Sequence, residues 1–101
     1  MKGRNPTAAE KDYMTKVVML GCIVCLEHHG VYSPPEIHHT DGKTKEDAHL
    51  RILGLCFNHH RAGQDNKDYT SRHPFKKRFE KRYGAEQELM VITKERIMDS
   101  E

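Results

Sequence analysis

The chain has 101 residues, which is enough for one compact domain and too few for two independently stable cores. Hydrophobic residues make up only 36% of it and charged residues 32%, so we expect a bound metal to help stabilise a small core. The sequence contains neither the roughly 20-residue apolar span of a membrane helix nor a secretory signal, so we expect a cytosolic protein without a membrane partner.

The N-terminal part of the chain predicts a flexible arm followed by a helix. Residues 1–6 end at a proline and form the arm. Thr7 and Glu10 have the spacing of a capping box, which begins a helix whose apolar residues recur at helical intervals. Gly21 then ends this helix, because glycine readily adopts the left-handed conformation found at helix C-termini.

Two short strands are expected in the middle of the chain. After a pair of cysteines, polar residues lead to two consecutive prolines, which favour an extended path and a strand over residues 36–39. Residues 40–48 form a polar loop that contains an Asp-Gly turn signal. The aliphatic run over residues 50–56 is the best candidate for the second strand.

The C-terminal part of the chain predicts a helix with one apolar stripe. Pro74 stands where the first residue of a helix often is a proline. Phe75, Phe79 and Tyr83 follow at intervals of four residues and would lie on one face, up to Gly84.

A last helical segment precedes the C-terminus, and its apolar residues lie between positions 89 and 97. We expect a single domain over residues 7–98, followed by an acidic tail at 99–101.

Residues 67–84 form a basic block on a chain that is otherwise slightly acidic. The block holds seven basic and two acidic residues, and the basic residues lie between the aromatic residues of the predicted helix. Such a block indicates either a polyanionic partner or simply a solvated helix face, and the neighbouring residues favour the partner.

Three cysteines against eight histidines indicate metal binding and not disulfides, because an odd number of cysteines cannot pair completely. Cys22 and Cys25 are separated by two residues, and so are Cys56 and His59. Four thiolate and imidazole ligands in two such pairs are typical of a structural zinc site. The alternative is three inert buried thiols and a surface histidine.

The remaining histidines include a pair on the first predicted strand. A zinc site that joins the two halves of the chain would bring His60 toward His38 and His39. Because adjacent residues of a strand point to opposite faces, His38 and His39 cannot have the same role. We expect one of them to bind a second metal with His60 and the other to face the substrate.

The order of these residues resembles the HNH endonuclease motif in its zinc-braced ββα-metal form. The segments Gly-Cys-Ile-Val-Cys, Tyr-Ser-Pro-Pro-Glu-Ile-His-His, Leu-Cys-Phe-Asn-His-His-Arg-Ala-Gly and Phe-Lys-Lys-Arg-Phe-Glu-Lys-Arg-Tyr-Gly are closer still to the phage Ref-like RecA-dependent nucleases. This similarity spans roughly residues 13–90. It implies an α+β fold with a small zinc-stabilised ββα core, flanked by an N-terminal helix and C-terminal helices. For a phage-encoded chain, the cytosol is that of the host cell.

The resemblance also implies a role for individual residues. His39 would be the general base, and His38 and His60 would hold a catalytic divalent ion, Mg²⁺ or Mn²⁺. No asparagine stands at the middle position of the motif, so His49 or Arg51 must replace it, and we prefer His49. The structural zinc ligands would be Cys22, Cys25, Cys56 and His59.

His73 is a further ligand, a phosphate contact or a plain helix N-cap. The partner implied by the resemblance is DNA, targeted through a RecA filament and cut with little intrinsic sequence specificity. Phosphate contacts would come from the basic helix, through Lys76, Lys77, Arg78, Lys81 and Arg82.

Two other functions use the same zinc ligands. One is a non-catalytic zinc module that binds nucleic acid through the basic helix, and the other is a zinc-stabilised adaptor for protein partners. Only the nuclease needs His39 as a base with a second metal position beside it.

Overall fold

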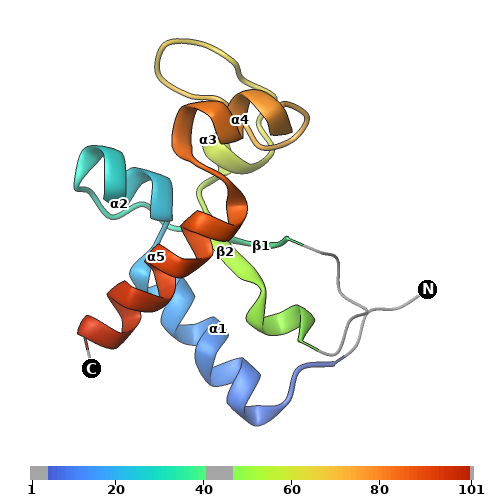
Figure 1. Cartoon of the computed structure of the whole chain (residues 1–101), viewed down its shortest axis with the longest axis vertical. Helices are drawn as coiled ribbons and strands as arrows, with labels where there is room; N and C mark the ends of the chain where they lie inside the picture. Colours follow the sequence, from blue (N-terminus) through green and yellow to red (C-terminus); the bar gives the residue numbers. More distant parts are fainter. Residues whose placement is uncertain (1–4, 41–46, 101) are drawn as a thin grey trace.

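The structure is a computed structural model of the whole chain, and it describes residues 5–40 and 47–100. Most of the predicted arm, the predicted Asp-Gly turn and the last residue of the predicted acidic tail lie outside these described residues. The described parts form a mixed α+β fold with a two-stranded sheet and several helices, which confirms the α+β class predicted from the sequence (Figure 1).

The two strands form an antiparallel pair at the centre of the molecule. β1 (Glu36–His39) pairs with β2 (Ile52–Leu55), so that His38 lies opposite Leu53 and His39 opposite Ile52. A short helix, α3 (Phe57–His60), follows β2 directly. The β1-β2-α3 unit therefore carries the predicted histidines His38 and His39 on its first strand and His60 on its helix (Figure 1).

The second strand is shorter than the aliphatic run predicted. Residues Ala48–Leu50 form a 3₁₀-helix, η1, in which the backbone N–H of Leu50 donates to the carbonyl of Asp47. This turn buries Ala48 and His49, and it delays the start of the strand to Ile52. The prediction of a strand from residue 50 is wrong. Ala48 and His49 are consecutive and both buried, and residues 48–50 form a helical turn in which both side chains are buried.

The first helix agrees with its sequence signals. α1 (Ala8–Leu20) begins with a capping box: Glu10 N–H donates to Thr7 Oγ1 at 3.2 Å, and Thr7 N–H donates to Glu10 Oε1 at 2.8 Å. Gly21 ends the helix, as predicted, and its φ of 88° is positive, but its ψ of −164° differs from the left-handed helical conformation that was expected.

A second helix, α2 (Ile23–His29), replaces the polar stretch predicted after the cysteines. The Cys22 side chain caps its N-terminus by accepting a hydrogen bond from the backbone of Cys25, and Gly30 ends it in the left-handed conformation. Its first turn is buried, and its second half is exposed. The exposed polar half explains why the helix cannot be seen from apolar periodicity.

The C-terminal helices are α4 (Lys76–Tyr83) and α5 (Glu86–Asp99). The aromatic stripe is present on α4, where Phe79 and Tyr83 are buried. The predicted helix start at Pro74 is wrong, because His73 N–H donates to the carbonyl of His60 and so holds this segment as a turn against α3.

The ends of the C-terminal helices differ from the prediction in two further details. His73 is not the N-cap of α4, since Phe75 occupies that position. The predicted acidic tail begins inside α5, because Asp99 is the last residue of that helix.

The core lies between the hairpin and helices α2, α4 and α5 (Figure 1). Gly54 allows β2 to pack closely against the backbone that follows α1, because a Cβ at this position would lie only 2.6 Å from the carbonyl oxygen of Gly21. The fully buried side chains include Ile23, Val24, Leu53, Leu55 and Phe79. Among the described residues, no helix is long and apolar enough to cross a membrane.

Candidate active site and metal centre

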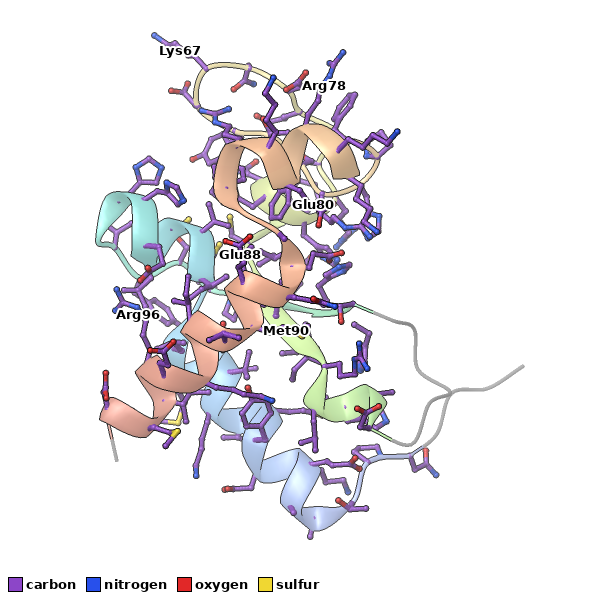
Figure 2. All side chains as sticks on the ribbon, in the orientation of Figure 1. Lys67, Arg78, Glu80, Glu88, Met90 and Arg96 are labelled. Atoms are coloured by element: carbon purple, nitrogen blue, oxygen red, sulfur yellow. The ribbon has the colours of Figure 1, made fainter. Side chains whose placement is uncertain are left out.

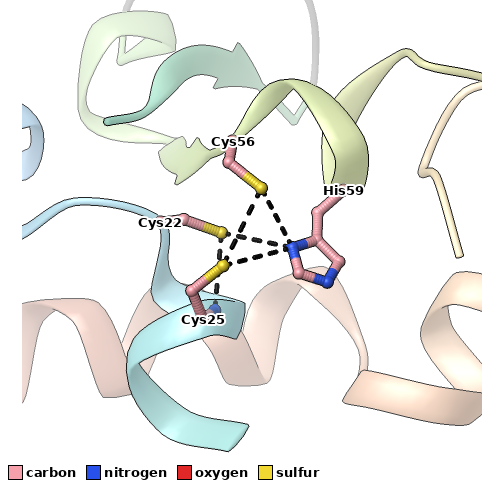
Figure 3. A group of neighbouring side chains, drawn as sticks. All are labelled: Cys22, Cys25, Cys56 and His59. Carbon is pink, nitrogen blue, oxygen red and sulfur yellow. Dashed lines mark hydrogen bonds between the residues drawn. The ribbon is translucent and has the colours of Figure 1, made fainter. Parts of the chain in front are cut away.

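Two short helices carry the four predicted zinc ligands. Cys22 is the N-cap of α2 and Cys25 lies in its first turn, while Cys56 is the N-cap of α3 and His59 lies within that helix. Each two-residue spacing therefore spans one helical turn, which points both donors of a pair in the same direction. All four residues are buried, and their donor atoms converge (Figure 3).

The spacing of the donor atoms fits one tetrahedral ion. Zinc bonds of about 2.3 Å to sulfur and about 2.0 Å to nitrogen imply contacts of about 3.8 Å between sulfurs and about 3.5 Å between sulfur and nitrogen. The Cys25 and Cys56 sulfurs are 3.8 Å apart, and His59 Nδ1 lies 3.6 Å from the Cys25 sulfur. His59 Nδ1 also lies 3.6 Å from the Cys22 sulfur and 3.2 Å from that of Cys56. This donor set is consistent with structural zinc.

The thiols influence one another's ionisation. Hydrogen bonds from Cys22 and His59 lower the pKa of the Cys56 thiol to about 3. The shared hydrogen bond with Cys56, followed by burial, raises the pKa of Cys22. The cluster thus favours the thiolate of Cys56, and a bound cation would favour ionisation of Cys22 and Cys25 as well.

A second cluster consists of three imidazoles from three parts of the chain. His38 lies on β1, His60 ends α3, and His73 lies on the turn before α4. The ring centroids form a nearly equilateral triangle, with separations of 5.1, 5.2 and 5.3 Å, and one nitrogen of each ring lies within 4.8 Å of the others. His38 is buried and His73 exposed, so the cluster opens to solvent on one side.

His73 retains a lone pair at neutral pH. Burial and then the positive charge of Arg72 lower the pKa of His73 below its ordinary value. A neutral imidazole is the form that binds metal ions.

Glu36 holds the second ring of the cluster. His60 Nδ1 and Glu36 Oε1 are hydrogen-bonded at 2.8 Å, and Arg61 donates to both oxygens of the same carboxylate. The Arg61 and His60 hydrogen bonds lower the pKa of Glu36 to about 2, so it is ionised at neutral pH. This contact occupies Nδ1 of His60 and leaves Nε2 for the centre of the cluster.

Glu86 contacts the first ring. His38 Nε2 and Glu86 Oε2 are hydrogen-bonded at 2.5 Å, and Arg72 forms an ion pair with the same oxygen at 3.2 Å. Burial opposes ionisation of Glu86, but the contact with His38 and the ion pair with Arg72 outweigh it and lower the pKa of Glu86.

His39 lies on the other side of β1, as expected for the neighbour of His38 on a strand. Its Nε2 is 3.1 Å from Nδ1 of His49, which the 3₁₀-helix buries at this position. Arg51, the alternative for the same place in the motif, is paired with Asp47 at 3.7 Å.

The basic residues of α4 fall into two groups. Lys76, Lys77 and Lys81 are exposed. Arg78 pairs with Asp65, and Arg82 donates to backbone carbonyls of the preceding loop. Arg78 and Lys67 mark this basic end of the molecule (Figure 2).

Comparison with known protein families decides the family of this chain. A family model described as "Recombination enhancement, RecA-dependent nuclease" matches residues 6–98. The chain belongs to this family. Membership identifies it as a nuclease that acts in recombination, and it agrees with the resemblance seen in the sequence.

Sequence reasoning missed several residues of this RecA-dependent nuclease. Glu36, Arg61, Arg72 and Glu86 surround the histidine cluster, but the sequence assigns none of the four a role in the site, although Glu36 and Arg61 lie in segments that carry the family resemblance. Glu36 and Arg61 adjoin predicted site residues, which is a weak local signal. Glu86 has no such signal, because an acidic residue at the start of a helix is common for electrostatic reasons alone.

Proposed function

We propose that this chain is a metal-dependent DNA endonuclease of the HNH type with a ββα-metal core. It hydrolyses phosphodiester bonds with little intrinsic sequence specificity and is directed to DNA that carries RecA. The observation that carries the proposal is the convergence of His38, His60 and His73 in an open cluster, with His39 on the adjacent position of the same strand.

The histidine cluster has the composition of a catalytic metal site. Three imidazole ligands on one side would leave positions for water and phosphate oxygens on the open side. When bound, a divalent ion there would neutralise charge on the phosphate and assist the departing oxygen. Nitrogen ligands favour Mn²⁺, Co²⁺ or Zn²⁺ over Mg²⁺, so we expect Mn²⁺ to support cleavage at lower concentrations than Mg²⁺.

His39 is proposed as the general base. An imidazole has an ordinary pKa near 6.5, so at neutral pH it is mostly unprotonated and able to accept a proton from water. If His39 Nε2 donates to His49 Nδ1, the lone pair of His39 lies on Nδ1. His49 would thus take the place of the middle residue of the motif and fix the tautomer of the base.

DNA would be held by the exposed lysines of α4. Contacts with backbone phosphates supply affinity without reading sequence. Lys76 also lines a groove of about 310 Å³ that reaches Arg51 and Glu86. Glu86 contacts His38, so a strand in this groove would lie near the histidine cluster. Since such contacts do not choose a site, the RecA filament would supply the targeting.

The test is a cleavage assay with Mg²⁺ or Mn²⁺, on plasmid DNA and on DNA paired by RecA filaments with a nucleotide. His39→Ala should abolish cleavage while zinc content and DNA affinity remain unchanged. His29→Ala, at an exposed histidine of α2, is the matched control and should cut normally. If zinc-loaded wild-type protein binds DNA but never cuts it under any of these conditions, the catalytic proposal fails.

A further inference from the structure

We propose that Glu86 is a positioning residue that fixes the tautomer of His38, so that His38 presents Nδ1 to the catalytic ion. The inference rests on the proposed function, because it concerns the same ion site. It adds a residue from the C-terminal helix, which lies far along the chain from the motif that defines the site.

The contact between Glu86 and His38 is buried. The two residues are 6% and 5% exposed, and the hydrogen bond joins His38 Nε2 to Glu86 Oε2. A buried carboxylate without partners would be strongly unfavourable, so this carboxylate requires the hydrogen bonds it accepts. The guanidinium of Arg72, whose Nε lies 3.2 Å from the same oxygen, favours the ionised form of this buried carboxylate. An ionised carboxylate only accepts, so this arrangement places the proton of the contact on Nε2 of His38.

Arg72 decides between positioning and direct metal binding by Glu86. Its side chain is only 13% exposed, and its Nε lies 3.2 Å from the same Glu86 oxygen that contacts His38. The two oxygens of one carboxylate are close together, so a dication bound to either of them would lie near the guanidinium of Arg72 and be repelled by it. Glu86 therefore acts through His38.

The start of α5 holds Glu86 in place. Glu86 is the first residue of the helix, and its backbone N–H donates to Oε2 of Glu80 at 3.3 Å. The carboxylate is thus fixed by α4, α5 and Arg72 together. With Nε2 protonated, the lone pair of His38 is on Nδ1, and a carboxylate partner of this kind orients a ligating histidine and raises its basicity.

The first test is the tautomer of His38 in zinc-loaded protein without a second metal. Nitrogen-15 NMR should show His38 protonated at Nε2 and unprotonated at Nδ1. A His38 protonated at Nδ1 would overturn the inference. This measurement uses the wild-type protein, so it does not depend on whether any variant folds.

The second test is Mn²⁺ affinity, measured by electron paramagnetic resonance at constant zinc content. Glu86→Ala should weaken Mn²⁺ binding by roughly 10–100-fold. Glu86→Gln keeps an acceptor oxygen for His38, so its loss of Mn²⁺ affinity should be much smaller. Glu88→Ala, at an exposed glutamate of the same helix, is the matched control and should bind Mn²⁺ like the wild type (Figure 2).

The outcomes separate this inference from the proposed function. If Glu86→Gln loses as much affinity as His38→Ala, Glu86 is itself a ligand and the positioning role is wrong. If Glu86→Ala folds and binds Mn²⁺ normally while His38→Ala does not, the inference fails and the ion site stands. If neither His38→Ala nor His60→Ala affects Mn²⁺ binding, the ion site itself is wrong.

Discussion

At the scale of single residues, two adjacent histidines have different surroundings because they lie on a strand. His38 faces Glu86 and the histidine cluster, and His39 faces His49. The sequence predicted this division from strand geometry. It did not predict Glu86, because a contact between residues 48 positions apart depends on how α5 packs, and no local pattern encodes that packing.

His49 provides a prediction at this scale. His49→Ala should lower the single-turnover cleavage rate by roughly tenfold or more, which is less than the roughly 10²–10⁴-fold expected for loss of the base itself. His49→Asn should retain more activity, because an amide can still pair with His39 and is the residue typical of the motif. Thermal unfolding of each variant checks that the buried position tolerates the change. Equal rates in the wild type and a folded His49→Ala variant would rule out the orienting role.

At the scale of elements, the two helices that carry the predicted zinc ligands are too short to be stable alone. α2 has 7 residues and α3 has 4, whereas isolated helices below about 12–15 residues are marginal in water. The spacing of the cysteines and His59 predicted which residues converge. It did not predict α2, because its exposed half has no apolar stripe and a side-chain cap from Cys22 begins it.

Removal of zinc should therefore unfold the domain. Structural zinc sites in small peptides bind with about 10 kcal/mol or more, which is comparable to the roughly 5–15 kcal/mol of total stability typical of a domain. Cys56→Ser, or a strong chelator on the wild type, should abolish cooperative thermal unfolding followed by circular dichroism. Zinc added back should restore it in the chelated wild type only. A chelated protein that unfolds at the unchanged temperature would exclude a stabilising role for zinc.

At the scale of the whole molecule, Lys67 and Arg78 of the basic block lie at one end (Figure 2), and the block includes His73 of the histidine cluster. The sequence predicted the block as a possible DNA contact. It did not predict that the lysines of α4 are exposed while its arginines contact the preceding loop. Arg78 and Arg82 brace the preceding loop, and this could not be foreseen because their partners, such as Asp65 and Asn66, are brought near by the fold alone.

The lysines of α4 should account for part of the salt dependence of DNA binding. Lys77→Ala with Lys81→Ala should weaken binding equally for unrelated sequences and lower the slope of log K against log salt by roughly 2. A double variant at exposed lysines elsewhere, Lys11→Ala with Lys94→Ala, should leave the slope unchanged. Fluorescence anisotropy over a salt series measures both. Equal slopes for the two double variants would place the DNA on another surface.

The proposal of two distinct metal sites is tested most directly by anomalous diffraction from zinc-loaded crystals soaked in Mn²⁺. Data collected on both sides of each absorption edge distinguish the two metals. We predict zinc among Cys22, Cys25, Cys56 and His59, and manganese bounded by His38, His60 and His73. Manganese absent from the histidine cluster at saturating concentration, or bound only elsewhere, would contradict the account.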